Sequence, residues 1–426
     1  MAVTHHFAAL TLRRGMSIAN NQSGPARDAR ELGPLLVSLC RRDASTQITD
    51  ADLRILDDAG TRTRFVDYAL AHGVLGLVLA TLQRVRPSVI AAHAELRERL
   101  HGCRRRAALM ELGRDRVLAV LRAAGLEPVA LKGAGLASAV YREPAERDFG
   151  DVDLLLPPDA IDRAVTALGG HGYQVPGTEA AEAGYREHHF HVRVQRPDGF
   201  IVELHWKLTR VIEPFHLDAA TFLAESVTLP GARGVRVPRA EHAILHMVLE
   251  SVRDGFDRLT RVVDVDRILA ATPDIDWRYV EETARAWRLL PSLALGLEMS
   301  RDMLGTPVPD DVRRRIRPPA AVRLHLALLA PGTSMLRQRS VRRPSWVTLL
   351  HLWLLSGESR ALALGRMFRG DDADPLDWLW RGDDSPDAAP TATVHPLRRL
   401  GKLALYQLGL YARGVTGLPR SWSGAR

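Results

Sequence analysis

Two aspartates spaced two residues apart open an apolar run near the middle of the chain. Asp151 and Asp153 flank Val152 and precede three consecutive leucines. Residues two apart on a β-strand point to the same side, so both carboxylates can hold one cation while the intervening valine enters a core. Paired carboxylates near a glycine turn are what metal-assisted phosphoryl chemistry requires. We therefore expect Asp151 and Asp153 to be catalytic metal ligands.

A third carboxylate lies on a later segment with strand periodicity. In residues 201–208, Glu203, His205 and Lys207 alternate with apolar side chains, which predicts a half-buried strand. If its polar face matches that of the aspartate strand, Glu203 completes a three-carboxylate site that can share two Mg²⁺ ions, with Mn²⁺ as the alternative. Two such ions activate an attacking oxygen and neutralise a leaving pyrophosphate. We place His205 and Lys207 on the acceptor side.

The residues before the aspartates have the features of a phosphate site. Lys132 and Gly133 follow a short apolar strand and precede a predicted helix over 136–141, whose N-terminal amides would point at a phosphate. Lys132 adds a point charge, and Arg147 would either clamp a triphosphate or pair with one of the aspartates. Gly150 adjoins Asp151. We expect Lys132, Gly133, Arg147 and Gly150 to bind nucleotide.

A second Asp-x-Asp motif shows that the spacing alone decides little. Asp264 and Asp266 lie within a helical pattern, where residues two apart diverge by about 200° around the axis. That pair is not expected to share one metal. Strand context, the glycine turn upstream and Glu203 downstream distinguish the first motif from the second.

Histidines cluster close to the proposed site. His189 and His191 would share one face of a strand, with His188 and His205 nearby, so a zinc site is conceivable. No fourth ligand stands at a familiar spacing, and cross-strand histidines are more often hydrogen-bonded structural groups. The structural interpretation is therefore preferred.

Periodicity divides the chain into five segments, and the expected fold class is α+β, predominantly helical, with a short mixed β-sheet core between helical domains. Strands are predicted within 129–131, 151–156, 189–194 and 201–208, and long amphipathic helical segments over 65–82, 96–121 and 277–304. The predicted segments are a disordered leader (1–30), an N-terminal helical domain (31–126), a mixed-sheet core (127–235), a helical domain (236–335) and a helical tail (336–426) with a flexible linker near 370–392.

Composition limits the classes of protein and of partner. The net charge is +8, but the charges are dispersed and only three of the 58 basic residues are lysines, which favours solvated arginine-rich faces over a nucleic-acid surface. Two distant cysteines support neither a disulfide framework nor a zinc site, and no apolar run is long enough to span a bilayer. We expect a cytoplasmic protein without a transmembrane segment.

The tail leaves two interpretations open. Four arginines within 337–343 precede an apolar stretch over 346–355. This combination could dock on an anionic membrane surface, although packing on the preceding helical domain is preferred.

The motifs together resemble a known family. The order Leu131-Lys132-Gly133, then Arg147 with Gly150-Asp151-Val152-Asp153, then Val202-Glu203-Leu204-His205-Trp206, is similar to the uncharacterised bacterial nucleotidyltransferases of the DNA polymerase β-like superfamily. The close resemblance covers residues 127–210. Gly133 is followed by Ala134, where many members of the superfamily have Gly-Gly or Gly-Ser, so a hydroxyl contact to phosphate is missing and backbone amides would serve instead.

The resemblance implies transfer of a nucleoside monophosphate from an NTP, such as ATP, to a hydroxyl or phosphate of an acceptor. It assigns the metal positions to Asp151, Asp153 and Glu203, and the phosphate turn to Gly133. The acceptor is left open between a small molecule, a peptide and RNA. A toxin-like enzyme acting on tRNA is one alternative, and a non-catalytic binding module that retains the fold is another. Carboxylates on opposite faces of the sheet would favour the module.

Overall fold

The computed structural model describes residues 25–176, 189–209, 213–229, 234–253 and 258–318. The chain divides into two compact units. The first comprises Met1–Arg210, Leu217–Ala243 and Ala270–Pro273, and the second comprises Val211–His216, Ile244–Leu269 and Asp274–Arg426. The helices outnumber the strands, and the strands form a mixed sheet, so the expected α+β class is confirmed.

The sheet lies in the first unit and has the strand order β3-β4-β2-β1-β6-β5. β2 is parallel to β4 and antiparallel to β1; β4 is antiparallel to β3; β1 is parallel to β6; and β6 is antiparallel to β5. Each predicted strand segment contains one strand, whereas the two-residue strands β5 and β6 were not expected. The strands are β1 (Val129–Ala130), β2 (Val152–Leu155), β3 (His191–Gln195), β4 (Ile201–His205), β5 (Val227–Thr228) and β6 (Arg236–Val237).

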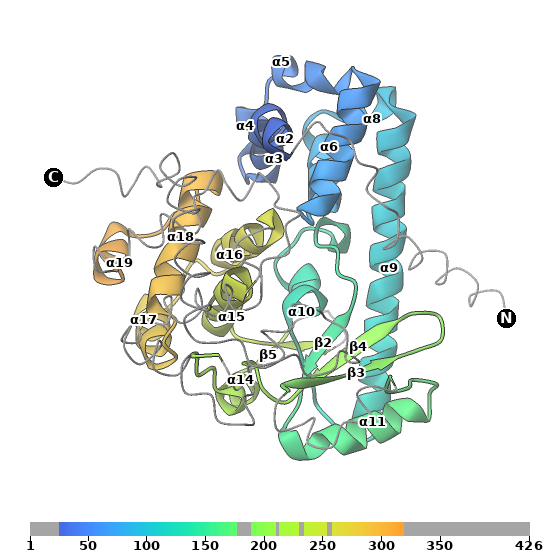
Figure 1. Cartoon of the computed structure of the whole chain (residues 1–426), viewed down its shortest axis with the longest axis vertical. Helices are drawn as coiled ribbons and strands as arrows, with labels where there is room; N and C mark the ends of the chain where they lie inside the picture. Colours follow the sequence, from blue (N-terminus) through green and yellow to red (C-terminus); the bar gives the residue numbers. More distant parts are fainter. Residues whose placement is uncertain (1–24, 177–188, 210–212, 230–233, 254–257, 319–426) are drawn as a thin grey trace, which may run out of the picture. The chain divides into compact units, whose positions relative to one another are not determined.

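Alternation along the central strands separates an apolar face from a polar one. Val202 and Leu204 on β4 pack in one core with apolar side chains of β2, β3, α9 (Ala94–Ala123), α10 (Lys132–Ala139) and α11 (Ile161–Gly169). Figure 1 shows α9 running alongside the sheet with α10 and α11 close to it. Asp153, Glu203 and His191 occupy the alternate positions of their strands. The fold therefore places the polar side chains on the sheet face opposite this helical core.

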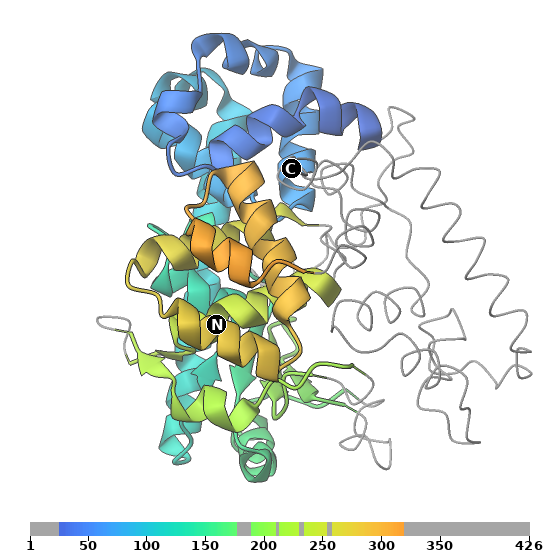
Figure 2. The same ribbon diagram turned by 90° about the vertical axis from the view of Figure 1, so that its left-hand side faces the viewer.

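The remaining helices of the first unit include an N-terminal group that gathers around the end of α9 distant from the sheet (Figures 1 and 2). The segment 65–82, predicted as one helical stretch, is divided between α6 and α7 because Gly73 adopts a left-handed φ of 69°. α2 begins inside the segment predicted as a leader. The N-terminal group consists of α2 (Pro25–Glu31), α3 (Gly33–Cys40), α4 (Ala44–Gln47), α5 (Asp50–Leu53), α6 (Ala59–Ala71), α7 (Leu75–Val85) and α8 (Pro87–Ala92). The first unit also contains α14 (Ala219–Ala224), which precedes β5.

Short 3₁₀ turns mark several connections in the first unit. One of them leads directly into α11, which ends at Gly169. The turns are η1 (Arg54–Leu56), η2 (Pro144–Glu146) and η3 (Pro158–Ala160).

The second unit is helical in its described part. The segment 277–304, predicted as one helical stretch, is two helices, because Arg288 has a left-handed φ of 60° and Pro291 starts the next helix. α18 ends at Gly305, whose φ of 73° is a left-handed C-terminal cap. The helices are α15 (Ala240–Arg253), which begins in the first unit, α16 (Leu259–Ala271), which ends there, α17 (Trp277–Ala286), α18 (Leu290–Leu304) and α19 (Asp310–Arg315).

Several predictions concern residues outside the described ones. These are the leader over 1–24, the arginines at 337–343, the apolar stretch at 346–355, and the tail with its linker near 370–392. Within the described residues, no helix combines the length and apolar character needed to cross a membrane.

Candidate functional site

The turn after β1 brings Lys132 to the aspartate strand. The amide of Leu131 donates to the carbonyl of Asp153 (2.9 Å), and Lys132 then adopts a left-handed φ of 46°. This conformation costs a non-glycine residue on the order of 1 kcal/mol. In this conformation the Lys132 Nζ lies 3.0 Å from Asp153 Oδ1. The backbone thus carries strain at the position where the sequence predicted a phosphate-binding ammonium.

Gly133 is required by a close approach of the chain to itself. A Cβ at this position would lie 2.5 Å from the Cβ of Phe149 and 3.2 Å from Arg147 Nη1. Arg147 is buried, and its Nη1 donates to the carbonyl of Asp148 (2.6 Å). The structure therefore brings two of the predicted nucleotide-binding residues, Gly133 and Arg147, to the same turn. Gly150 lies in the bend that leads to β2.

A buried arginine holds the helix that follows this turn. Arg114 of α9 donates through Nη1 to the carbonyl of Ala134 (2.9 Å) and to Ser138 Oγ (2.8 Å), both in α10. Its Nη2 pairs with Asp115 (3.0 Å), and Ser138 Oγ donates to Glu111 (2.8 Å). Sequence reasoning missed Arg114, because nothing in a helical pattern marks one arginine among many as a contact to another helix.

Asp153 and Glu203 stand side by side on the sheet. β2 and β4 are parallel, and their register pairs these two residues directly, so both carboxylates lie on the same face. His205 connects them, since its Nε2 lies 3.0 Å from Asp153 Oδ1 and 3.5 Å from Glu203 Oε2. β2 begins at Val152, so Asp151 lies in the half-buried bend before the strand. The strand argument that paired the two aspartates therefore applies to Asp153 alone.

The charges in this group stabilise one another. Burial by itself raises the pKa of Asp153, but the Lys132 ammonium and the hydrogen bond from His205 outweigh it and hold that pKa far below its usual value. Burial also raises the pKa of Glu203, but the hydrogen bond from His205 helps to outweigh it, and the pKa of Glu203 is lowered. Burial disfavours protonation of His205, yet its two carboxylate partners raise its pKa. The group therefore keeps both carboxylates ionised at neutral pH.

His191 joins the group from the neighbouring strand. The antiparallel register of β3 and β4 sets His191 opposite His205, and His191 Nε2 lies 3.9 Å from Glu203 Oε1. Burial and the nearby His205 lower the pKa of His191 to about 4, so its imidazole is neutral at physiological pH. His189 precedes β3, and His188 lies outside the described residues. The sequence singled out these histidines but could not give the register that joins two of them to Glu203.

The remaining acceptor-side residue is in solvent. Lys207 follows β4 and is exposed, whereas His205 is buried against Asp153. The two residues, predicted to share one role, therefore have different surroundings.

Comparison with known proteins identifies the family of the chain. Residues 59–305 match the model of a protein family described as uncharacterised nucleotidyltransferase. The chain belongs to this family. No curated protein and no solved structure matches the chain. The matched range contains the Lys132 turn, Asp151, Asp153, Glu203 and both histidines of the site, so the polar group lies within the nucleotidyltransferase match.

The second Asp-x-Asp of the chain, Asp264 and Asp266, lies in a helix. Asp264 and Asp266 are fully buried in α16. Asp266 accepts a hydrogen bond from Thr306 Oγ1 (2.7 Å) and pairs with Arg267. The helical geometry predicted from the sequence holds.

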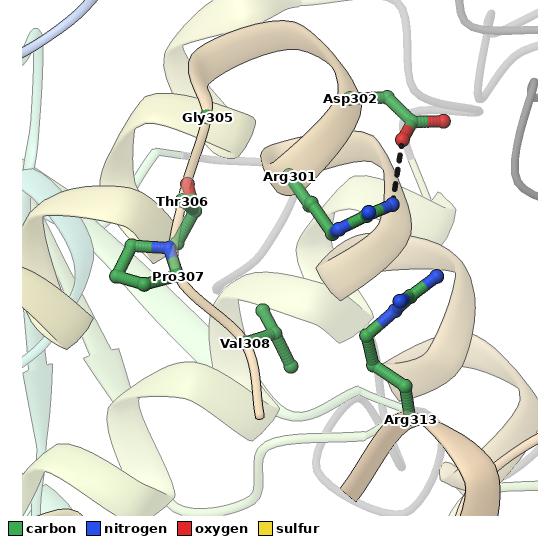
Figure 3. A pocket seen from close by; sticks show the side chains of 7 residues that line it. All are labelled: Arg301, Asp302, Gly305, Thr306, Pro307, Val308 and Arg313. Carbon is green, nitrogen blue, oxygen red and sulfur yellow. Dashed lines mark hydrogen bonds and ion pairs between the residues drawn. The ribbon is translucent and has the colours of Figure 1, made fainter. Parts of the chain in front are cut away.

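A separate hollow in the second unit carries compensated charges. It encloses about 620 Å³ beside the end of α18 (Figure 3). Arg301 pairs with Asp302 (3.4 Å), and Arg313 pairs with Glu298 (2.8 Å). Neither arginine therefore brings an uncompensated charge to the hollow. The lining residues are Arg301, Asp302, Gly305, Thr306, Pro307, Val308 and Arg313.

Proposed function

We propose that the chain is a metal-dependent nucleotidyltransferase that moves a nucleoside monophosphate from an NTP to an acceptor. The observation that carries this proposal is the pairing of Asp153 with Glu203 on one sheet face, next to the Lys132-Gly133 turn at the start of α10. Carboxylates beside a turn and a helix N-terminus combine cation and phosphate binding in one place. A non-catalytic module would not require these carboxylates to share a face.

The oxygen donors suit magnesium. Asp151, Asp153 and Glu203 would hold Mg²⁺, in two ions, with Mn²⁺ as a substitute. Such ions would neutralise the charge that develops on the leaving pyrophosphate. The Lys132 ammonium already compensates part of the charge of Asp153. Asp153 and Glu203, with Asp151 in the bend before β2, would supply the negative charge that attracts cations.

The turn residues are proposed to bind the triphosphate. Lys132 would contact a phosphate oxygen from its place beside Asp153, and the backbone amide after Gly133 would donate to another. The Arg147 guanidinium lies next to Gly133, where it would contact a phosphate oxygen. Gly150 gives the chain its bend before Asp151. Because the turn is packed tightly against Phe149, these donors are held in place before nucleotide arrives.

Glu203 is proposed to accept the proton from the acceptor. Its side chain is partly exposed, whereas His205 is buried and bonded to Asp153. Glu203 can therefore meet an incoming hydroxyl, while His205 fixes the orientation of both carboxylates. Exposed Lys207 would bind the acceptor, whose class is a small molecule, a peptide or RNA.

The test is a transfer assay with each of four α-labelled NTPs, ATP first, in the presence of Mg²⁺. Acceptors are supplied as the small-molecule, protein and RNA fractions of a cell extract. We expect one labelled product, lost in Asp151→Ala and in Asp153→Asn but retained in Asp159→Asn, a change at an exposed residue. Equal labelling by Asp153→Asn and the unaltered chain would contradict a role of Asp153 in the transfer reaction.

A further inference from the structure

Two imidazoles and a carboxylate from adjacent strands converge on the polar sheet face. His191, Glu203 and His205 each offer one ligand atom, and these atoms all lie within 4.8 Å of one another. The β3–β4 register produces this meeting, because it sets His191 directly opposite His205. Glu203 faces both rings, with one oxygen 3.9 Å from His191 Nε2 and the other 3.5 Å from His205 Nε2.

These separations are close to those of donors on a single metal ion. Ligand atoms bound at about 2.0–2.2 Å lie about 2.8–3.6 Å apart at neighbouring corners of an octahedron or tetrahedron. The distance from His205 Nε2 to Glu203 Oε2 (3.5 Å) already falls in this range. The ligand atom of His191 lies within 4.8 Å of the other two, so His191 must approach by up to about 1 Å to share one ion with them. Asp153 Oδ1, at 3.0 Å from His205 Nε2, stands within reach as a fourth donor.

The rings are held in place by packing. His205 is 2% exposed, and the centroids of the two imidazoles are 5.0 Å apart. Phe190 contacts both rings, with centroid distances of 4.5 Å to His191 and 5.5 Å to His205. An aromatic wall on this side excludes water and fixes the rings, so the donors are preorganised.

The donor types decide which cation fits. Imidazole nitrogens suit zinc, copper, iron and nickel, whereas magnesium prefers oxygen ligands. We propose that His191, Glu203 and His205 form a site for a divalent transition metal ion, which shares Glu203 with the carboxylates assigned to magnesium. A role of this ion in nucleotide transfer would rest on the proposed function. The expectation of a transition metal ion rests on the two imidazoles alone.

The surroundings also set the strength of binding. Neither His191 Nδ1 nor His205 Nδ1 has a hydrogen-bond partner among the described residues. Ligating histidines usually donate this second N–H to a carboxylate or carbonyl, and loss of such a partner costs about 10–100-fold in affinity. We therefore expect this site to bind its ion about 10–100-fold more weakly than a site whose histidines have such partners.

The test uses metal alone, without nucleotide. The full chain, stripped with chelator, is titrated with Co²⁺ and followed by its visible absorption, and Zn²⁺ and Mn²⁺ are then added as competitors. We expect one Co²⁺ per chain at this site, displaced by Zn²⁺ and not by millimolar Mg²⁺. His191→Ala should weaken binding at least about 10-fold. His171→Ala, at an exposed turn, is the matched control and should bind as the unaltered chain does.

Displacement of Co²⁺ by Mg²⁺ as readily as by Zn²⁺ would overturn the proposal, as would unchanged affinity in His191→Ala. His191→Gln, which keeps a polar side chain on β3, serves if the alanine variant fails to fold, and should weaken Co²⁺ binding similarly. Absence of metal binding beside intact nucleotide transfer refutes this site alone. Metal binding without transfer supports the site and counts against the proposed function.

Discussion

The close packing of Gly133 gives a quantitative prediction about the phosphate turn. A Cβ at Gly133 would lie 2.5 Å from the Cβ of Phe149, an atom fixed to the backbone that no rotamer change can remove. Overpacking of this kind costs about 1–3 kcal/mol. Gly102, in α9, has no atom within 4 Å of an added Cβ, so alanine there should gain about 0.5–1 kcal/mol from helix propensity.

Equilibrium unfolding of the full chain in urea, followed by far-UV circular dichroism, compares the two variants. Gly133→Ala should lower the free energy of unfolding by about 1–2 kcal/mol, and Gly102→Ala should raise it by up to about 1 kcal/mol. A shift of the turn by about 1 Å should also lower kcat/KM for nucleotide transfer about 100-fold in Gly133→Ala. Equal stability of the two alanine variants would refute the packing argument.

Three further changes test buried ionisable side chains and their partners in the first unit. Lys132→Met removes the ammonium 3.0 Å from buried Asp153, and should cost about 3 kcal/mol in urea unfolding and raise KM for NTP; an unchanged KM would contradict phosphate binding by Lys132. Arg114→Met frees α10 from α9, and should cost about 2–3 kcal/mol; a loss below 0.5 kcal/mol (a rough threshold) would contradict its positioning role. Burial lowers the pKa of His242 to about 4, so between pH 6.5 and 4 the unfolded chain binds more protons than the folded one. The free energy of unfolding should therefore fall by up to about 3 kcal/mol as the pH is lowered from 6.5 to 4. This fall should be smaller in His242→Phe, and an unchanged dependence on pH in that variant would contradict the assignment.

Local patterns predicted most of the strands around the site. Alternation over 201–208 correctly separated Glu203 and His205 from the apolar positions, because period-2 patterning follows directly from strand geometry. Sequence analysis placed Glu203 beside Asp153 only on the condition that their two strands are neighbours with matching polar faces. No sequence pattern indicates which strands pair, and the pairing of β2 with β4 comes from the structure.

Other features depend on contacts between distant residues. The bond between His205 and Asp153 joins two strands whose order is set by the whole sheet. The pairing of Lys132 with Asp153 depends on a left-handed backbone at a non-glycine residue, which no propensity indicates. The break at Arg288 has the same origin. Isolated turns of this kind interrupt helices that periodicity alone would continue.

The most direct test of the nucleotidyltransferase proposal compares two parallel reactions that differ only in the labelled phosphate of the NTP. The chain is incubated with Mg²⁺, the acceptor fraction and an NTP labelled at either the α- or the γ-phosphate. The proposal predicts that the α label passes to the acceptor, that the γ label leaves as pyrophosphate at the same rate, and that Asp153→Asn abolishes both. Transfer of the γ label to the acceptor, or full activity of Asp153→Asn, would contradict it.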